Sequence, residues 1–228
     1  MNTLLDNPAW SALCSKQNQW NVGTDAVKYY PANMSPFIAI NDWHNKNNIE
    51  QLHATISANR TFALLTNTTV NLPANLFQIV FTTPLYQMYC KQLSFLNSSS
   101  VSIQQLTNAS ISQMLALTEL TKPGPFYEKT IDFGNYIGIF NEDELIAMAG
   151  ERLQLNGYTE VSAICTKPGY LGKGFASYLL FESAKRIINE GNIPFLHVKT
   201  DNTRAIAVYQ KLGFEIRTEM FFAIFKKI

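Results

Sequence analysis

The spacing of hydrophobic and polar residues is most regular in the second half of the chain. Apolar and polar residues alternate, or apolar residues run together between turn formers, over 136–140, 145–155, 158–166, 194–199 and 214–225. These runs predict strands, with a shorter one at 101–106. The pair Asn156-Gly157 predicts a hairpin turn, because both residues tolerate positive φ. Helical spacing of apolar residues predicts helices over 174–189 and 203–212, and a third that Asn108 or Ser110 caps and that ends before Pro123.

The first hundred residues contain shorter and less regular patterns. They predict a turn into a strand over 35–40, a helix over 49–56, and strands over 61–65 and 77–81. The run Leu-Asn-Ser-Ser-Ser at 96–100 is the best candidate linker. We therefore expect two regions, an α/β N-terminal region of unknown role (1–98) and a larger domain (99–228). The predicted fold class is α/β (α+β), with a mixed sheet flanked by helices.

Composition and charge narrow the function. The chain has 228 residues, 46% of them hydrophobic and 15% charged, with a formal net charge of +1, so it is globular and has no basic field for nucleic acid or anionic lipid. Its three cysteines lie far apart, which argues against a disulfide framework or a cysteine-built metal site. Neither a signal peptide nor an apolar run of about 20 residues is present. We expect a cytoplasmic protein without a metal.

The segment 166–176 joins a predicted strand to a predicted helix and contains Gly172 and Gly174. A helix N-terminus exposes unpaired amides and a partial positive charge, and glycines let the backbone approach an anion closely. Lys173 is followed by Gly174 rather than by the Ser or Thr of a Walker A loop. A third glycine three residues after Gly174, which a dinucleotide fingerprint requires, is also missing. A pyrophosphate could bind to these amides, although the glycines could also serve only a tight turn.

The same segment resembles the GNAT superfamily of acyl-CoA N-acyltransferases. The signature of that family, Gln/Arg-x-x-Gly-x-Gly/Ala, aligns with 171–176 and departs from it at Leu171. A second signature aligns with Asn202, Ala205, Tyr209, Gly213 and Phe214. The resemblance covers about 101–228, and the run 194–202 is also similar to the glycine-acyltransferase branch.

The resemblance implies a path for acetyl-CoA, the expected co-substrate. The strand end at Ile164, Cys165 and Thr166 would pair its backbone with the pantetheine arm. Asn202 would contact the pantetheine where two strands separate, and Ala205 of the second signature is also an expected cofactor-binding residue. The pyrophosphate would be held by the backbone of Leu171, Gly172, Lys173, Gly174, Phe175 and Ala176.

Catalysis needs a proton for the leaving thiolate and a neutral amine. By resemblance, Tyr209 is the candidate general acid near the sulfur, and Glu160 is the candidate general base. Their other interpretations are a tyrosine packed on the sheet and a solvated strand glutamate. Strict alternation would place Glu160 on one face of its strand and Cys165 on the other, so that Cys165 packs in the core.

Further residues are expected near the acceptor. Glu151 and His197 lie on neighbouring strands and are reserve candidates for the base, with water as another. The loop 121–126, which contains Phe126, follows the first helix of the GNAT-like part and is expected to shape the substrate pocket.

These residues predict an N-acetyltransferase that moves an acetyl or other acyl group from acetyl-CoA to a primary amine by direct transfer. The expected acceptor is a small molecule or an amino acid. The alternative is a catalytically silent CoA-binding sensor or interaction module. Whether the chain forms a homodimer is left open.

Overall fold

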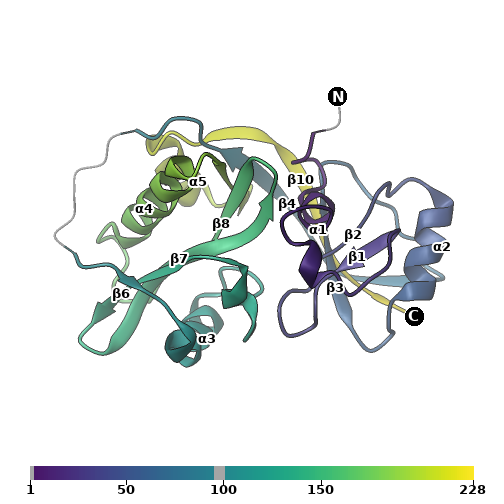
Figure 1. Cartoon of the computed structure of the whole chain (residues 1–228), viewed down its shortest axis with the longest axis horizontal. Coiled ribbons are helices and arrows are strands. Elements are labelled where there is room, and N and C mark those ends of the chain that lie inside the picture. The colour runs from purple at the N-terminus through teal and green to yellow at the C-terminus, as the bar shows by residue number, and fades with distance from the viewer. Residues whose placement is uncertain (1–2, 95–100) are drawn as a thin grey trace.

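A computed structural model describes residues 3–94 and 101–228 (Figure 1). One eight-stranded sheet dominates it, in the order β3-β10-β4-β9-β8-β7-β6-β5, and a two-stranded sheet pairs β1 with β2. The strands are β1 (Val27–Tyr29), β2 (Ile38–Ile40), β3 (Thr61–Thr66), β4 (Phe77–Tyr89), β5 (Gln104–Gln105), β6 (Tyr136–Asn141), β7 (Glu144–Leu155), β8 (Tyr158–Thr166), β9 (Ile193–Lys199) and β10 (Glu215–Lys227).

Helices lie on both sides of the large sheet (Figure 1). The α-helices are α1 (Pro8–Leu13), α2 (Lys46–Thr55), α3 (Ile111–Thr121), α4 (Phe175–Asn189) and α5 (Thr203–Lys211). Short 3-10 helices are η1 (Asn18–Trp20), η2 (Asn108–Ser110) and η3 (Thr130–Phe133). The mixed sheet flanked by helices confirms the predicted fold class.

The large sheet draws strands from both predicted regions. β4, from the first hundred residues, lies between β9 and β10 and pairs antiparallel with each, and β3 pairs with β10. The strands β8 and β9 are parallel and are joined through α4, whereas the other neighbours are antiparallel. The predicted linker at 96–100 lies outside the described residues.

Several elements differ from their predicted bounds. β4 continues past its predicted end at 81 and passes through Pro84, where a strand pattern ordinarily stops. Pro84 precedes Leu85, the residue at which β9 begins to pair with β4. α1 and β1 were not predicted, because each is short and owes its burial to tertiary contacts rather than to its own period. In the predicted strand 101–106, only Gln104–Gln105 pair with β6.

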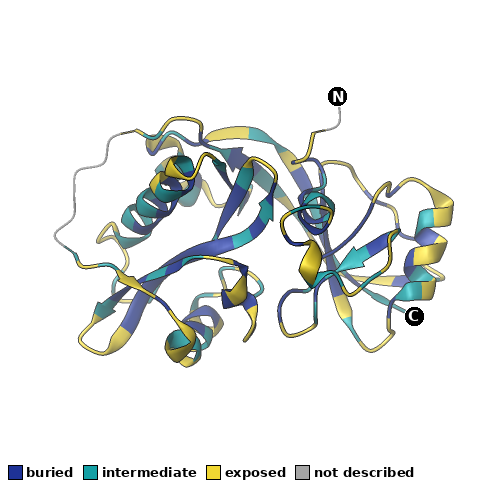
Figure 2. Cartoon of the chain, viewed as in Figure 1, coloured by how far each residue is buried: buried dark blue, intermediate teal, exposed yellow. Residues whose placement is uncertain are grey.

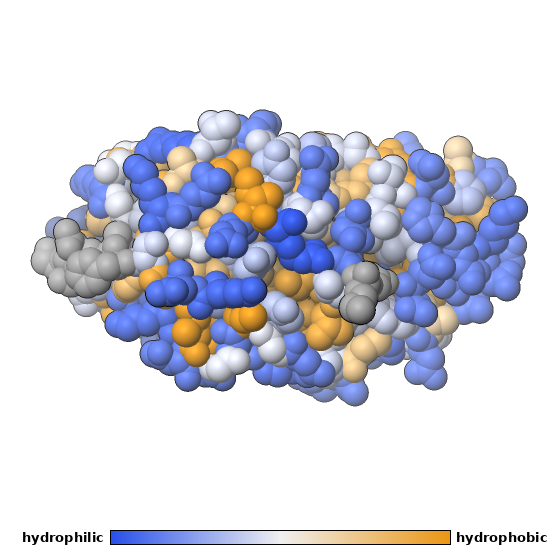
Figure 3. Space-filling model, turned by 90° about the horizontal axis from the view of Figure 1, so that it is seen from above, coloured by the Kyte–Doolittle hydropathy of each residue, from blue (hydrophilic) through white to orange (hydrophobic). Residues whose placement is uncertain are grey.

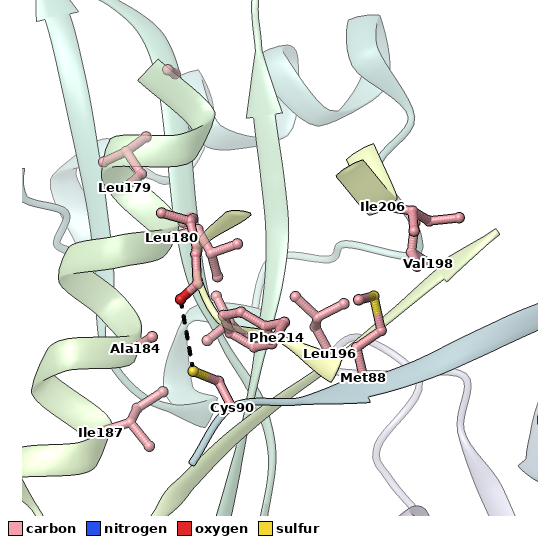
Figure 4. Close-up of a cluster of buried hydrophobic side chains, with 14 of the residues drawn as sticks. Met88, Cys90, Leu179, Leu180, Ala184, Ile187, Leu196, Val198, Ile206 and Phe214 are labelled. Atoms are coloured by element: carbon pink, nitrogen blue, oxygen red, sulfur yellow. Dashed lines mark hydrogen bonds between the residues drawn. The ribbon is translucent and has the colours of Figure 1, made fainter. Parts of the chain in front are cut away.

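The core beside α4 packs that helix against the sheet. Leu179, Leu180, Ala184 and Ile187 project from α4 toward a buried group that includes Leu196 on β9 (Figure 4). The strands of the sheet are largely buried and the outer faces of the helices exposed (Figure 2). On the face seen from above, hydrophilic residues predominate and hydrophobic ones form separate patches (Figure 3). None of the described helices is both long and apolar enough for a membrane crossing.

Candidate active site

The strands β8 and β9 separate after a short paired stretch. Only Tyr158–Glu160 of β8 pair with Ile193–Phe195 of β9. Beyond Glu160 the two strands no longer pair, although β8 continues to Thr166 and β9 to Lys199. The unpaired ends leave backbone groups of both strands available for another extended group.

A β-bulge at Ala163 changes which side chains share a face of β8. Ala163 has a positive φ of 53°, and the pairing with β7 shifts register between Gly150↔Ser162 and Met148↔Cys165. Ala163 and Cys165 both pack in the cluster beneath α3, whereas Val161 packs in the cluster beneath α4. The expectation that Cys165 lies on the opposite face from Glu160 was therefore wrong, since both face the α3 side, whereas its packing in the core is confirmed.

Two cavities meet where β8 and β9 separate. The outer one, of about 380 Å³, runs along the glycine-bearing bend and α5, and includes Gly172, Gly174 and Ala176 in its lining. The inner one, of about 550 Å³, extends under α3 toward β3, β4 and β10. Both are lined by Ile164, Cys165, Thr166, Asn202 and Tyr209. These five residues define the junction of the cavities.

The bend before α4 has the backbone that an anion site requires. Gly172 and Gly174 have φ values of 82° and 80°, and a Cβ at either would meet no atom within 4 Å. Gly174 is the N-cap of α4, and neither a capping side chain nor an acidic residue neutralises the first turn. The first amides of α4 thus face the outer cavity without an intrahelical partner. Leu171 is 58% exposed, and Lys173 places its ammonium 4.9 Å from the ring centroid of Tyr170.

The second signature lies on α5 and its N-terminus. The side chain of Asn202 caps the helix by accepting from the amide of Ala205 at 3.2 Å. Tyr209 lies at the junction, and no described residue hydrogen-bonds to its hydroxyl. Burial raises the pKa of Tyr209 to about 12, so the phenol is protonated at neutral pH. Burial likewise raises the pKa of Cys165 to about 11, which leaves it a thiol rather than a nucleophilic thiolate.

Glu160 is the centre of a buried polar network. Its carboxylate, fully buried, accepts two hydrogen bonds from Arg152, at 2.9 and 2.6 Å, and one of its oxygens lies 2.7 Å from Nδ1 of His197. Burial alone would raise the pKa of Glu160, but the charge and hydrogen bonds of Arg152, with the hydrogen bond from His197, lower it to about 2. A carboxylate with this pKa holds a proton poorly, which weighs against a direct role as general base. That role stays a prediction.

His197 connects Glu160 to the N-terminal region. Its Nε2 lies 3.0 Å from the amide nitrogen of Gln87, which also donates to the carbonyl of Leu5 at 2.9 Å. The amide oxygen of Gln87 accepts from Arg217 at 2.8 Å, so the amide nitrogen is the atom that faces His197. Nε2 is therefore the acceptor, and Nδ1–H donates to Glu160. The ring is held at both of its nitrogens and forms part of the wall of the inner cavity.

The low pKa of Glu160 predicts a dependence of stability on pH. Between about pH 4.5 and pH 2 the unfolded chain binds a proton that the folded chain does not, so this group's stabilisation is present above that window and is lost as the pH falls. The shift from 4.5 to about 2 corresponds to about 3 kcal/mol. We expect urea unfolding to show this loss as the pH falls from about 5 to about 2. An equal loss in a variant lacking both Glu160 and Arg152 would contradict this assignment.

The other predicted substrate residues lie outside the inner cavity. Glu151 faces α4, where it forms an ion pair with Arg186, and it accepts from the amide of Asn135 at 3.1 Å. Phe126 packs edge-on against Tyr136 with ring centroids 5.8 Å apart, and it lines smaller cavities next to the inner one. Its neighbours Pro123, Gly124 and Pro125 do line the inner cavity. Roles for Glu151 and Phe126 in substrate binding stay predictions.

Sequence reasoning missed Arg152 and Gln87. Arg152 could have been predicted from the sequence. Counting outward from the Asn156-Gly157 turn places residue 153 opposite Glu160, and Arg152 is its neighbour. Gln87 could not have been predicted, because it lies in the unpredicted second half of β4. It contacts His197 only because β4 and β9 are neighbours in the sheet.

Comparisons with known proteins agree with this geometry. A family model described as FR47-like protein matches residues 136–223. A GNAT-family acetyltransferase structure from Novosphingobium aromaticivorans is similar over 100% of both chains, with 27% identity and a TM-score of 0.91. A GCN5-related N-acetyltransferase from Kribbella flavida aligns over 96% of this chain and 95% of its own, with 13% identity and a TM-score of 0.64.

A relative found by sequence matches a smaller part of the chain. An uncharacterised protein of Mycobacterium leprae is 38% identical over 85 residues, which make up 35% of this chain and 23% of that protein. This chain therefore matches about a quarter of that relative's length, and none of these matches shows the narrower glycine-acyltransferase branch. The full-length structural match, the family model and the fold together place this chain in the GNAT superfamily.

Proposed function

We propose that this protein transfers an acetyl group from acetyl-CoA to the primary amine of a small molecule or amino acid. The observation that supports this most directly is the meeting of two cavities at the separated ends of β8 and β9. The outer cavity begins at an unpaired helix N-terminus suited to a pyrophosphate, and the inner one is large enough for a second substrate. A thioester that lies along the outer cavity would present its carbonyl to the inner one.

Direct transfer follows from this arrangement. The neutral amine attacks the thioester carbonyl from the inner cavity, the carbon–sulfur bond breaks, and the amine loses its extra proton to solvent. Tyr209, protonated at the junction, donates a proton to the departing thiolate and recovers one from solvent. Cys165 is a buried thiol, so a route through an acyl-cysteine has no activated nucleophile.

For Glu160 we propose a positioning role in addition to its candidacy as base. It holds Arg152 and His197 in the wall of the inner cavity and fixes the tautomer of His197. Such a support keeps the wall rigid while the acceptor binds.

The experiment that tests the proposed function follows free thiol release from acetyl-CoA with a panel of amines and amino acids, alongside calorimetry with CoA. Turnover of any amine supports the transferase. CoA binding without turnover of any of them would favour a silent CoA-binding module. Absence of CoA binding would overturn both.

The glycine-bearing bend gives a sharper prediction with a matched control. Gly172→Ala places a Cβ where the pyrophosphate would bind, so we expect CoA affinity to fall on the order of tenfold, measured by calorimetry. Gly157→Ala has a similar φ of 78° and equally open surroundings, but lies in the β7–β8 turn. Both variants should lose about 1–2 kcal/mol of stability from the left-handed backbone. Equal CoA affinity in the two variants would remove the bend from the site.

A further inference from the structure

The inner cavity is cationic, and its charge comes from two lysines. Among the described residues that line it, none is Asp or Glu, whereas Lys122, Arg152 and Lys199 are present. Arg152 is neutralised by its two hydrogen bonds to Glu160. Neither Lys122 nor Lys199 has an ion-pair partner among the residues that the structure describes. The uncompensated charge of the cavity is therefore positive.

Both lysines lie near the junction where the thioester carbonyl would be. Lys199 ends β9, and its carbonyl accepts from the amide of Asn202 at 3.0 Å. Lys122 ends α3 in a left-handed conformation directly after Thr121, whose side chain interacts with the thiol of Cys165. Both lysines are exposed and so remain hydrated when the cavity is empty.

The part of the cavity away from the junction is apolar. Phe37 and Leu65, both buried, and the half-buried Phe222 of β10 form this wall. The rings of Phe37 and Phe222 pack edge-on with centroids 6.3 Å apart. An acetyl group alone would leave this volume of about 550 Å³ largely empty, and burial of an apolar group there is favourable.

We propose that the acceptor is an α-amino acid with a large apolar side chain. This rests on the proposed function and specifies its substrate. The carboxylate binds between Lys122 and Lys199 at the junction, the α-amine faces the thioester, and the side chain packs on Phe37, Leu65 and Phe222. Polyamines should be poor acceptors, because the described residues of the cavity lining offer cations and no carboxylate to a second ammonium group.

Only the neutral amine can attack the thioester, and the substrate carboxylate compensates the lysines once bound. Transfer then forms the amide bond and releases the thiol, with one proton leaving the amine and one reaching the sulfur.

The test compares four acceptors in the thiol-release assay. L-Phenylalanine carries both recognised groups, phenethylamine lacks the carboxylate, glycine lacks the side chain, and spermidine is a polycation. We expect kcat/KM for phenylalanine to exceed each of the others by roughly tenfold or more. Higher kcat/KM for glycine or spermidine would overturn the inference while the transferase function stands. If no amine in the wider panel were acetylated, the proposed function itself would fail.

Substitutions of the two lysines test whether they bind the substrate carboxylate. Lys199→Met and Lys122→Met should each lower kcat/KM for phenylalanine by roughly tenfold and leave that for phenethylamine nearly unchanged. Lys185→Met on α4, outside both cavities, is the matched control and should change neither. Equal losses for phenylalanine and phenethylamine in the cavity variants would show that the lysines do not bind the carboxylate, and would overturn the proposal.

Discussion

Tyr209→Phe should lower kcat by about 10²- to 10⁴-fold, the usual contribution of a positioned general acid, and should leave CoA affinity nearly unchanged. The substitution removes only a hydroxyl that has no hydrogen-bond partner among the described residues, so it leaves no orphaned group behind. The ring continues to pack near Phe214, 6.4 Å away between centroids, and to line the junction of the two cavities. Steady-state kinetics with acetyl-CoA, together with calorimetry of CoA, measures both quantities.

Tyr170→Phe is the matched control for this prediction. Tyr170 lines the outer cavity but not the inner one, so loss of its hydroxyl should not affect proton transfer at the sulfur. If Tyr209→Phe retained kcat within a few-fold of the control, the phenol would be only a packing residue. That outcome would leave proton delivery to water.

The predictable part of the fold is the part whose signals are local. The period of α4, the Asn156-Gly157 turn and the strands around them depend on residues close in sequence, and the structure has them near their predicted bounds. The insertion of β4 between β9 and β10 has no local signal, because a strand carries no record of its neighbours in the sheet. The inner cavity takes Phe81, Thr83 and Leu85 from β4, Leu65 from β3, and Phe222 and Ile224 from β10, so its apolar wall could not be predicted.

The site shows the same division between local and long-range information. The bend at Gly172 and Gly174 and the position of Tyr209 follow from short motifs, and the structure brings them to two cavities that meet. The surroundings of Glu160 do not follow from a motif. Its pKa depends on Arg152 and His197, which come from two other strands, and the bulge at Ala163 changes which side chains face them. A role assigned by motif alone therefore needs the electrostatics of the folded chain.

Glu160→Gln should destabilise the protein by about 3–5 kcal/mol, because it leaves the guanidinium of Arg152 buried without a counter-charge. The side chains of Arg152 and Glu160 are 11% and 0% exposed, so water replaces little of the lost interaction. His197 would also lose the acceptor that fixes its tautomer. Urea unfolding at neutral pH, analysed as a two-state transition, measures the change.

The double variant Glu160→Gln/Arg152→Met separates structural from catalytic roles. Removing both charges together should restore most of the stability, since replacing a buried pair with neutral groups costs far less than breaking it. If Glu160 were the general base, this folded variant would show a pH–rate profile shifted to higher pH. If Glu160 acts by positioning Arg152 and His197, the profile should keep its shape while KM for the acceptor rises. A single variant as stable as the wild type would contradict the ion pair itself, and with it the reason for the low pKa of Glu160.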